Sequence, residues 1–258
     1  MRLMKRILSA AAVLALSASL LVGCSSGTAS SVPVSASSAA ESTVSSVEET
    51  ASSAVDENEA AAAQLLNDLT GSYQELWPVI LADEYKQTWL DDCTALVGED
   101  NAEAAFEKLS SMVTSDVYGE DAVEAYANGG GAYFCGFTNS LAILTFDGET
   151  STISGTDKDG NVLFSHTYHY IGMEPVRGLY EFQSDDADSG EFTYFFLAPD
   201  TSAETYHIEF RYGSDAEALS QYDTGEYAYW LASGISTDCD QTMIDNCIEL
   251  FCTENLAG

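Results

Sequence analysis

Basic side chains are scarce in this sequence. Its 258 residues include 8 Lys and Arg against 42 Asp and Glu, so the formal net charge is −34. A field of that sign repels phosphate backbones, and we therefore expect no nucleic-acid partner. The excess of carboxylates is typical of a solvated acidic surface. It does not indicate a calcium site, because no complete D-x-[DN]-x-[DN]-G loop occurs.

The motifs of common enzyme classes are also missing. The chain contains no H-E-x-x-H, no G-x-S-x-G and no glycine loop of the kind that binds phosphate. Three consecutive glycines at 129–131 precede a predicted strand, so no helix N-terminus faces a phosphate there. We predict that the protein is not an enzyme.

The N-terminus has the pattern of an export signal. Three basic residues among the first six precede an apolar run at 7–22, which is short for a membrane span. The run ends in L-V-G-C, which resembles a bacterial lipobox with Cys24 in the last place. We predict a lipoprotein signal peptide over 1–23 and lipidation of Cys24. The mature chain would be lipid-anchored at the extracytoplasmic face of the cell membrane; the alternative is an ordinary secretory signal with an incidental cysteine.

A low-complexity segment follows the predicted anchor. Residues 25–55 include twelve Ser, six Ala and three Thr, which bury too little apolar surface to offset the entropy of ordering. We interpret 24–58 as a disordered Ser/Ala-rich tether. About 200 residues remain, enough for one domain with a substantial core, which we place at 59–258.

The spacing of hydrophobic residues along the sequence divides this domain into helical regions and a region of strands. Helices are predicted in its first half and at its end, at 59–69, 73–81 with a kink at Pro78, 83–97, 101–112, 121–127, 215–222 and 240–252. From residue 132 the period changes to two, with strands predicted near 132–138, 141–146, 150–156, 161–171, 177–184, 191–198 and 204–213. Asp-Gly turns at 147–148 and 159–160 favour antiparallel hairpins. The pattern predicts an α+β fold with a closed antiparallel meander flanked by helices.

The last predicted strand carries the most informative pattern. Side chains alternate across a strand, so Ile208, Phe210 and Tyr212 share one face while His207 and Glu209 share the other. An imidazole and a carboxylate two residues apart on one face are able to bind one divalent metal ion. His207 and Glu209 are therefore candidate metal ligands; the alternative is that they are ordinary polar residues on the solvent side of a half-exposed strand.

Five segments of the chain resemble sequences typical of the ZinT (ZinT/AdcA-type) family of zinc-binding proteins, and they occur in the same order as in that family. These segments lie at 71–78, 176–182, 185–190, 197–199 and 206–215. The resemblance covers about 65–232 and implies a lipocalin-like (calycin) β-barrel. It also implies zinc (Zn2+), which this family binds through three histidines, one ahead of an I-A-P segment and two in an H-x-H pair.

Carried over residue by residue, that histidine set is only partly retained. His207 takes the first place of the H-x-H pair, Glu209 takes the second, and Phe195 stands ahead of the Leu-Ala-Pro segment at 197–199. The remaining histidines, His166 and His169, differ by three along one predicted strand and so point to opposite faces. Either is able to replace the missing ligand if its strand lies next to the last one, and we favour His169.

Two functions follow from this reading. The first is a lipid-anchored, ZinT-like protein that binds zinc or another divalent ion at the barrel mouth and captures or buffers metal for a metal ABC transporter. The second is a ZinT-fold scaffold that has lost its metal, in which aromatic residues around Phe195 bind a small hydrophobic ligand, a peptide or a surface protein. Donors that converge in a pocket favour the first function, and donors exposed on the barrel exterior favour the second. The pairing of the five cysteines beyond Cys24 stays open.

Overall fold

The computed structural model describes residues 57–198 and 207–257. The signal peptide predicted at 1–23, the lipidation site Cys24 and most of the predicted tether lie outside these ranges. Within them, no helix has both the length and the apolar character needed to cross a bilayer.

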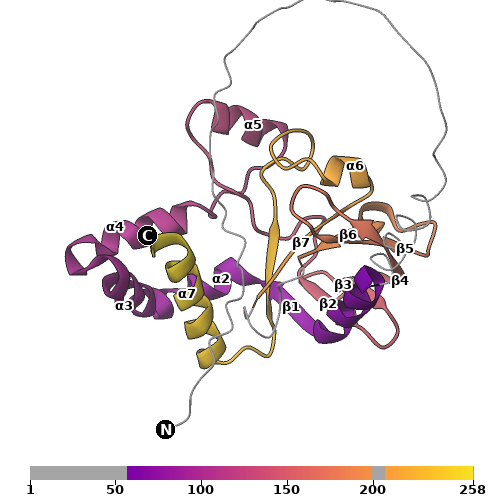
Figure 1. The fold of residues 1–258 in the computed structure, drawn as a ribbon, viewed down its shortest axis with the longest axis horizontal. Coiled ribbons are helices and arrows are strands. Elements are labelled where there is room, and N and C mark those ends of the chain that lie inside the picture. The colour runs from indigo at the N-terminus through magenta and orange to yellow at the C-terminus, as the bar shows by residue number, and fades with distance from the viewer. Residues whose placement is uncertain (1–56, 199–206, 258) are drawn as a thin grey trace, which may run out of the picture. The chain divides into compact units, whose positions relative to one another are not determined.

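Eight antiparallel strands form a closed barrel in sequence order, and the last strand pairs with the first. They are β1 Gly71–Glu75, β2 Ile143–Asp147, β3 Thr152–Thr156, β4 Val162–Met173, β5 Tyr180–Ser184, β6 Tyr194–Leu197, β7 His207–Gly213 and β8 Ala232–Ser236. The predicted fold class, an α+β antiparallel barrel with flanking helices, is confirmed (Figure 1). The predicted turns at 147–148 and 159–160 join β2 to β3 and β3 to β4.

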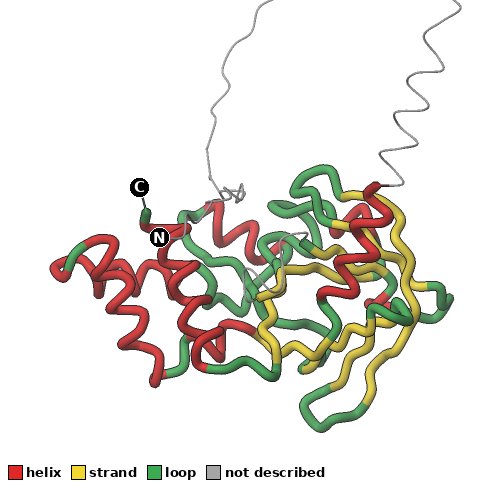
Figure 2. Tube along the Cα trace, turned by 60° about the horizontal axis from the view of Figure 1, so that its bottom comes forward, coloured by secondary structure: helices red, strands yellow, loops and turns green. Residues whose placement is uncertain are grey.

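Helices flank this barrel at several places along the chain. A helix over 57–68 precedes β1. The others are α2 Leu76–Ile80, η1 Asp83–Tyr85, α3 Lys86–Val97, α4 Glu99–Ser111, α5 Glu120–Ala127, η2 Gly190–Phe192, α6 Ala216–Leu219 and α7 Gln241–Leu256. Figure 2 shows the helical segments gathered mainly beside the strands, with α3, α4 and α7 forming one group (Figure 1).

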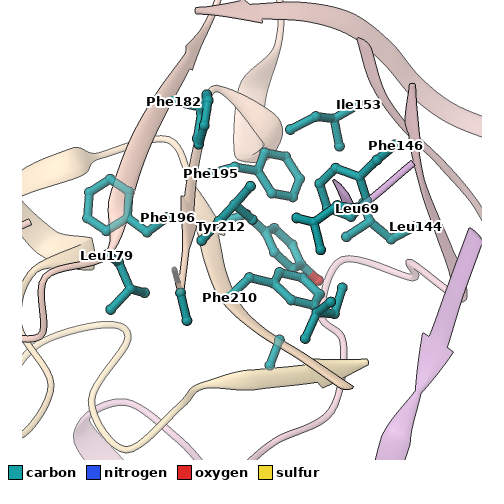
Figure 3. Packing of buried hydrophobic residues seen from close by; sticks show 14 of the residues in the cluster. Leu69, Leu144, Phe146, Ile153, Leu179, Phe182, Phe195, Phe196, Phe210 and Tyr212 are labelled. Carbon is teal, nitrogen blue, oxygen red and sulfur yellow. The ribbon is translucent and has the colours of Figure 1, made fainter. Parts of the chain in front are cut away.

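The barrel interior is a packed aromatic core. Alternate residues of each strand point inward, among them Phe146, Phe182, Phe195, Phe210 and Tyr212 (Figure 3). The ring centroids of Phe195 and Tyr212 lie 5.3 Å apart, and those of Phe195 and Phe210 lie 6.4 Å apart. Apolar residues of the helix at 57–68 join this cluster. Aromatic rings therefore occupy the interior that many barrels use for a ligand.

A second core lies between the outer wall of the barrel and the helices. Residues of α2, α3, α4 and α7 pack together there with Ile235 of β8. Trp89 on α3 is fully buried, and its Nε1 donates a 2.7 Å hydrogen bond to the carbonyl oxygen of Ile80. This layer makes the outer face of β7 and β8 an interior surface of the domain.

Two predicted elements differ from the structure, and one strand was missed. The helix predicted at 73–81 is strand β1 followed by α2, in which Pro78 lies in the first turn, where its missing N–H costs no helical hydrogen bond. The strand predicted at 132–138 is irregular, with isolated bridges from Phe134 to Thr114 and Trp230. Strand β8 was not predicted, because its sequence A-S-G-I-S has weak strand propensity.

Candidate functional site

Strand β7 presents two different faces, as its alternating sequence predicts. Ile208, Phe210 and Tyr212 point into the barrel core. His207 and Glu209 point outward, where they pair across the sheet with Ile235 and Ser233 of β8. The predicted position at the barrel mouth is wrong, because this outer face lies in the layer between barrel and helices.

Helix α7 covers His207. The imidazole is 8% exposed and packs against Phe251, with 5.2 Å between ring centroids. Cys247, one helical turn earlier on the same face of α7, lies beside the imidazole and raises its pKa. The helical spacing of Cys247 and Phe251 was visible in the sequence, but local sequence does not reveal which strand such a face covers.

His207 and Glu209 form an ion pair in which His207 is buried and Glu209 is half-buried. His207 Nε2 lies 3.8 Å from Glu209 Oε1, and the side chain of Glu209 is 31% exposed. Burial opposes the charged imidazole, but the neighbouring Cys247 and the negative charge of Glu209 outweigh it and raise the pKa of His207 well above 6.5. Burial also opposes the charged carboxylate, but His207 and the Arg177 guanidinium lower the pKa of Glu209 below 4.5.

Further polar side chains lie beside this pair. The thiol of Cys135 is buried, and burial together with the charge of Glu209 raises its pKa to about 12, while the neighbouring Ser233 and Trp77 act in the opposite direction. Without a metal ion, a thiol with such a pKa stays protonated at neutral pH, and it packs among the buried residues next to α2 and α7. Cys135 is therefore a packing residue of the layer between barrel and helices.

The other two histidines lie on β4. His169 is exposed, and its Nδ1 lies 2.6 Å from Asp185 Oδ1. His166 Nδ1 lies 2.7 Å from Asp186 Oδ2. Strands β5 and β6 separate β4 from β7, so the structure does not bring His169 to the pair on β7. Over the ranges 57–198 and 207–257, no three His, Cys, Asp or Glu residues are grouped so as to hold a metal ion.

The position ahead of the Leu-Ala-Pro segment also points away from the pair. Phe195 is fully buried in the barrel core and pairs with Phe182 and Tyr212 on the inner face. It does not line a mouth next to His207, and a histidine at this position would face the core. The resemblance placed Phe195 at the position of a family zinc ligand, but this position on β6 faces the barrel core and not His207 or Glu209.

Arg211 is a buried cation on the outer face of β7 that sequence reasoning did not single out. Its guanidinium donates hydrogen bonds to the carbonyl oxygens of Leu219, Gln221 and Tyr227 and lies 4.3 Å from the ring centroid of Tyr222. These contacts fasten the segment between α6 and β8 to the barrel. Within the described residues, the Nε of Arg211 is buried and makes no hydrogen bond, so only its two terminal nitrogens hold this segment.

Structure comparison finds similarity to two solved structures from Streptococcus pneumoniae. The Zn(II)-bound ZinT-like domain of AdcA has 15% sequence identity and a TM-score of 0.45, over 71% of this chain and 89% of that chain. Zn(II)-bound AdcA has 14% identity and a TM-score of 0.41, over 75% of this chain and 35% of that chain. The chain resembles a ZinT-like domain. At these identities the likeness concerns the fold alone. No protein-family model and no curated protein matches the sequence.

The donor set on β7 fits a divalent ion only in part. A separation of 3.8 Å between Nε2 and Oε1 is compatible with bonds of about 2.0–2.2 Å from both atoms to one ion. Zinc sites in proteins generally have at least three protein ligands, and no group of three is formed within the described ranges. The pair therefore supplies two of the three or more protein ligands that a zinc site generally has.

Proposed function

We propose that this domain binds a divalent metal ion, zinc first, through His207 Nε2 and Glu209 Oε1. The observation that carries the proposal is their 3.8 Å separation, which leaves space for an ion between them. The two His–Asp pairs on β4, at 2.6 and 2.7 Å, are direct hydrogen bonds. The proposed role is binding, and it requires no catalytic group.

The proposed site has low affinity and low selectivity. Two protein ligands leave the other coordination positions to water, and a His/carboxylate set is harder than three histidines, so it accepts manganese or calcium more readily. Such a site suits the capture or buffering of metal at high local concentration. From the sequence we further propose a lipid anchor at Cys24, a position on the extracytoplasmic face of the membrane, and a metal ABC transporter as partner.

A second candidate function is supported by the burial of the pair. His207 and Glu209 already satisfy each other beneath α7, so the pair has a structural role that needs no metal. In that case the domain is a scaffold without metal, and its ligand binds elsewhere. The packed aromatic interior argues against the barrel core as that place.

Calorimetric titration of zinc into the chelator-treated full-length protein distinguishes the two functions. Metal binding at the pair predicts saturable one-to-one binding that His207→Ala abolishes and Glu209→Gln weakens. His169→Ala is the matched control, because His169 is paired with a carboxylate but lies on β4. Thermal melts of each apo variant establish that it is folded. Binding that is unaffected by His207→Ala in a folded variant contradicts the proposal.

A further inference from the structure

Two buried thiols meet between helices α3 and α7. Cys93 on α3 and Cys252 on α7 are both fully buried, and their Sγ atoms lie 3.9 Å apart although 159 positions separate them in the sequence. Both belong to the core between the helices and the outer barrel wall. All five cysteines of the described ranges carry free thiols in this structure.

The 3.9 Å contact is close to what a disulfide requires. A disulfide has a sulfur–sulfur bond of about 2.05 Å, so the two atoms must approach by roughly 1.9 Å. Rotation about the Cα–Cβ bonds moves sulfur atoms over such distances without displacing the helices. Among the described cysteines, Cys93 and Cys252 are the one pair whose sulfur atoms are in contact; Cys135 lies beside Ser233 and Trp77, Cys247 lies beside His207, and Cys239 is half-buried.

We propose that Cys93 and Cys252 form a disulfide when the chain meets a disulfide oxidant, either a small one such as oxidised glutathione or a thiol–disulfide oxidoreductase. One cysteine thiolate attacks the oxidant, forms a mixed disulfide and releases one thiol. The second cysteine sulfur then displaces the other thiol and closes the Cys93–Cys252 bond. The chain loses two hydrogen atoms, and the oxidant is reduced to two thiols.

Disulfide formation should occur mainly while the chain folds, before the helices have packed around the two thiols. Burial raises the pKa of both thiols, so the attacking thiolate is rare once the helices have packed. The oxidant also has no access to sulfur atoms that are fully buried. The bond should therefore form quickly during refolding and slowly in the native protein. The export signal predicted from the sequence would place folding in a compartment where such oxidants occur.

The disulfide would fasten α7 to α3. The same helix α7 carries Phe251 and Cys247, which cover and contact His207. Oxidation of the two thiols would therefore fix α7 in its position over His207, whether or not His207 and Glu209 bind a metal ion. Because the bond closes a loop of more than a hundred residues, it should raise the melting temperature by about 10 °C.

The test uses full-length protein refolded in a mixture of oxidised and reduced glutathione. Free thiols are alkylated under denaturing conditions, disulfides are then reduced and labelled with a second reagent, and peptides are identified by mass spectrometry. We expect a linked Cys93–Cys252 peptide in the unreduced digest and the second label on both residues. Cys93→Ser and Cys252→Ser should each remove the link, whereas Cys135→Ser, a buried control without a cysteine partner, should retain it.

The wild-type measurement decides the question even if a serine variant does not fold. If both Cys93 and Cys252 carry the first alkylating label after oxidative refolding, their thiols were still free, and this result contradicts the proposal. A link from either residue to Cys239 or Cys247 contradicts it as well. An oxidised protein with the expected link but the melting temperature of the reduced form would contradict the stabilising role of the bond.

Discussion

His207 and Glu209 share the outer face of β7 with 3.8 Å between Nε2 and Oε1, and α7 covers the imidazole. This relationship couples three properties of the domain. The pair is an ion pair in the apo protein, a candidate metal site, and a contact between barrel and helical layer. Each property responds differently to pH and to substitution, which makes them separable by experiment.

Zinc affinity should rise with pH across the neutral range. The proton on His207 competes with the metal ion, and its raised pKa extends that competition above pH 6.5. While one proton is displaced for each ion bound, affinity should increase about tenfold per pH unit and then level off above the pKa of His207. Calorimetry in buffers of different ionisation enthalpy counts the released proton. Affinity that does not change with pH would show that the ion binds elsewhere.

Glu209→Gln should destabilise the apo protein most at mildly acidic pH. His207, whose pKa is raised, contributes stability that is complete below pH 6.5 and lost as pH rises through its folded pKa. Glu209, whose pKa is lowered, contributes stability above pH 4.5 that is lost as pH falls through its folded pKa. Urea denaturation should give a loss of roughly 1–3 kcal/mol near pH 5.5 and a smaller loss at pH 9. Equal losses at both pH values would mean that the two charges do not interact.

Arg211→Met should weaken the fold strongly. The substitution leaves the carbonyl oxygens of Leu219, Gln221 and Tyr227 without their shared donor and removes the contact with Tyr222. We expect a loss of about 3 kcal/mol or more in the free energy of unfolding. Arg177→Met is the comparison, because Arg177 stacks on the same ring but is only half-buried. Equal effects of the two variants in urea denaturation would contradict this assignment.

Asp92→Asn should stabilise the protein at neutral pH. Asp92 on α3 faces Glu249 and Asp245 of α7, and burial together with these charges raises its pKa. An acid with a raised folded pKa costs stability once pH rises above that value, and the cost is absent when the acid is protonated. Melting at low salt should show a gain of roughly 0.5–1 kcal/mol at pH 7 and none near pH 3. Asp68→Asn, on the helix at 57–68, should show no such gain.

Gly148→Ala should destabilise the contact between the β2–β3 turn and the helix at 57–68. A Cβ at this position would lie 2.4 Å from the Asn67 Cα and 2.6 Å from the carbonyl oxygen of Leu66, and neither backbone atom is able to move freely. We expect a cost of about 2 kcal/mol in thermal or urea denaturation. Gly130→Ala, where the nearest atom is 3.5 Å away, is the matched control and should be tolerated.

Local sequence predicted the fold where short-range signals dominate. The Asp147-Gly148 and Asp159-Gly160 turns and the alternation along β7 appear in the structure as expected. The strands β1 and β8 escaped prediction because their residues are small or polar and their pairing partners are distant in sequence. Gly234 illustrates the point: a Cβ there would lie 3.0 Å from Ile208, its partner on the neighbouring strand β7, so packing between the two strands favours a residue that local propensity disfavours.

The candidate site could also be predicted only in part, because sequence patterns report local structure and not which elements pack together. The shared face of His207 and Glu209 follows from a period of two, which is a local property. Their burial depends on α7, which packs on β7 only in three dimensions. The choice of His169 depended on which strand neighbours which, and β5 and β6 lie between β4 and β7.

Pairing of β8 with β1 also sets the order in which this chain is able to complete its fold. A chain synthesised from its N-terminus exposes β1 long before residues 232–236 exist, so the barrel stays an open sheet with β1 and β7 as unpaired edges. Such late, long-range closure slows folding and lengthens the time during which edge strands are able to pair with other molecules. Aggregation should therefore be the characteristic failure of any fragment that ends before β8.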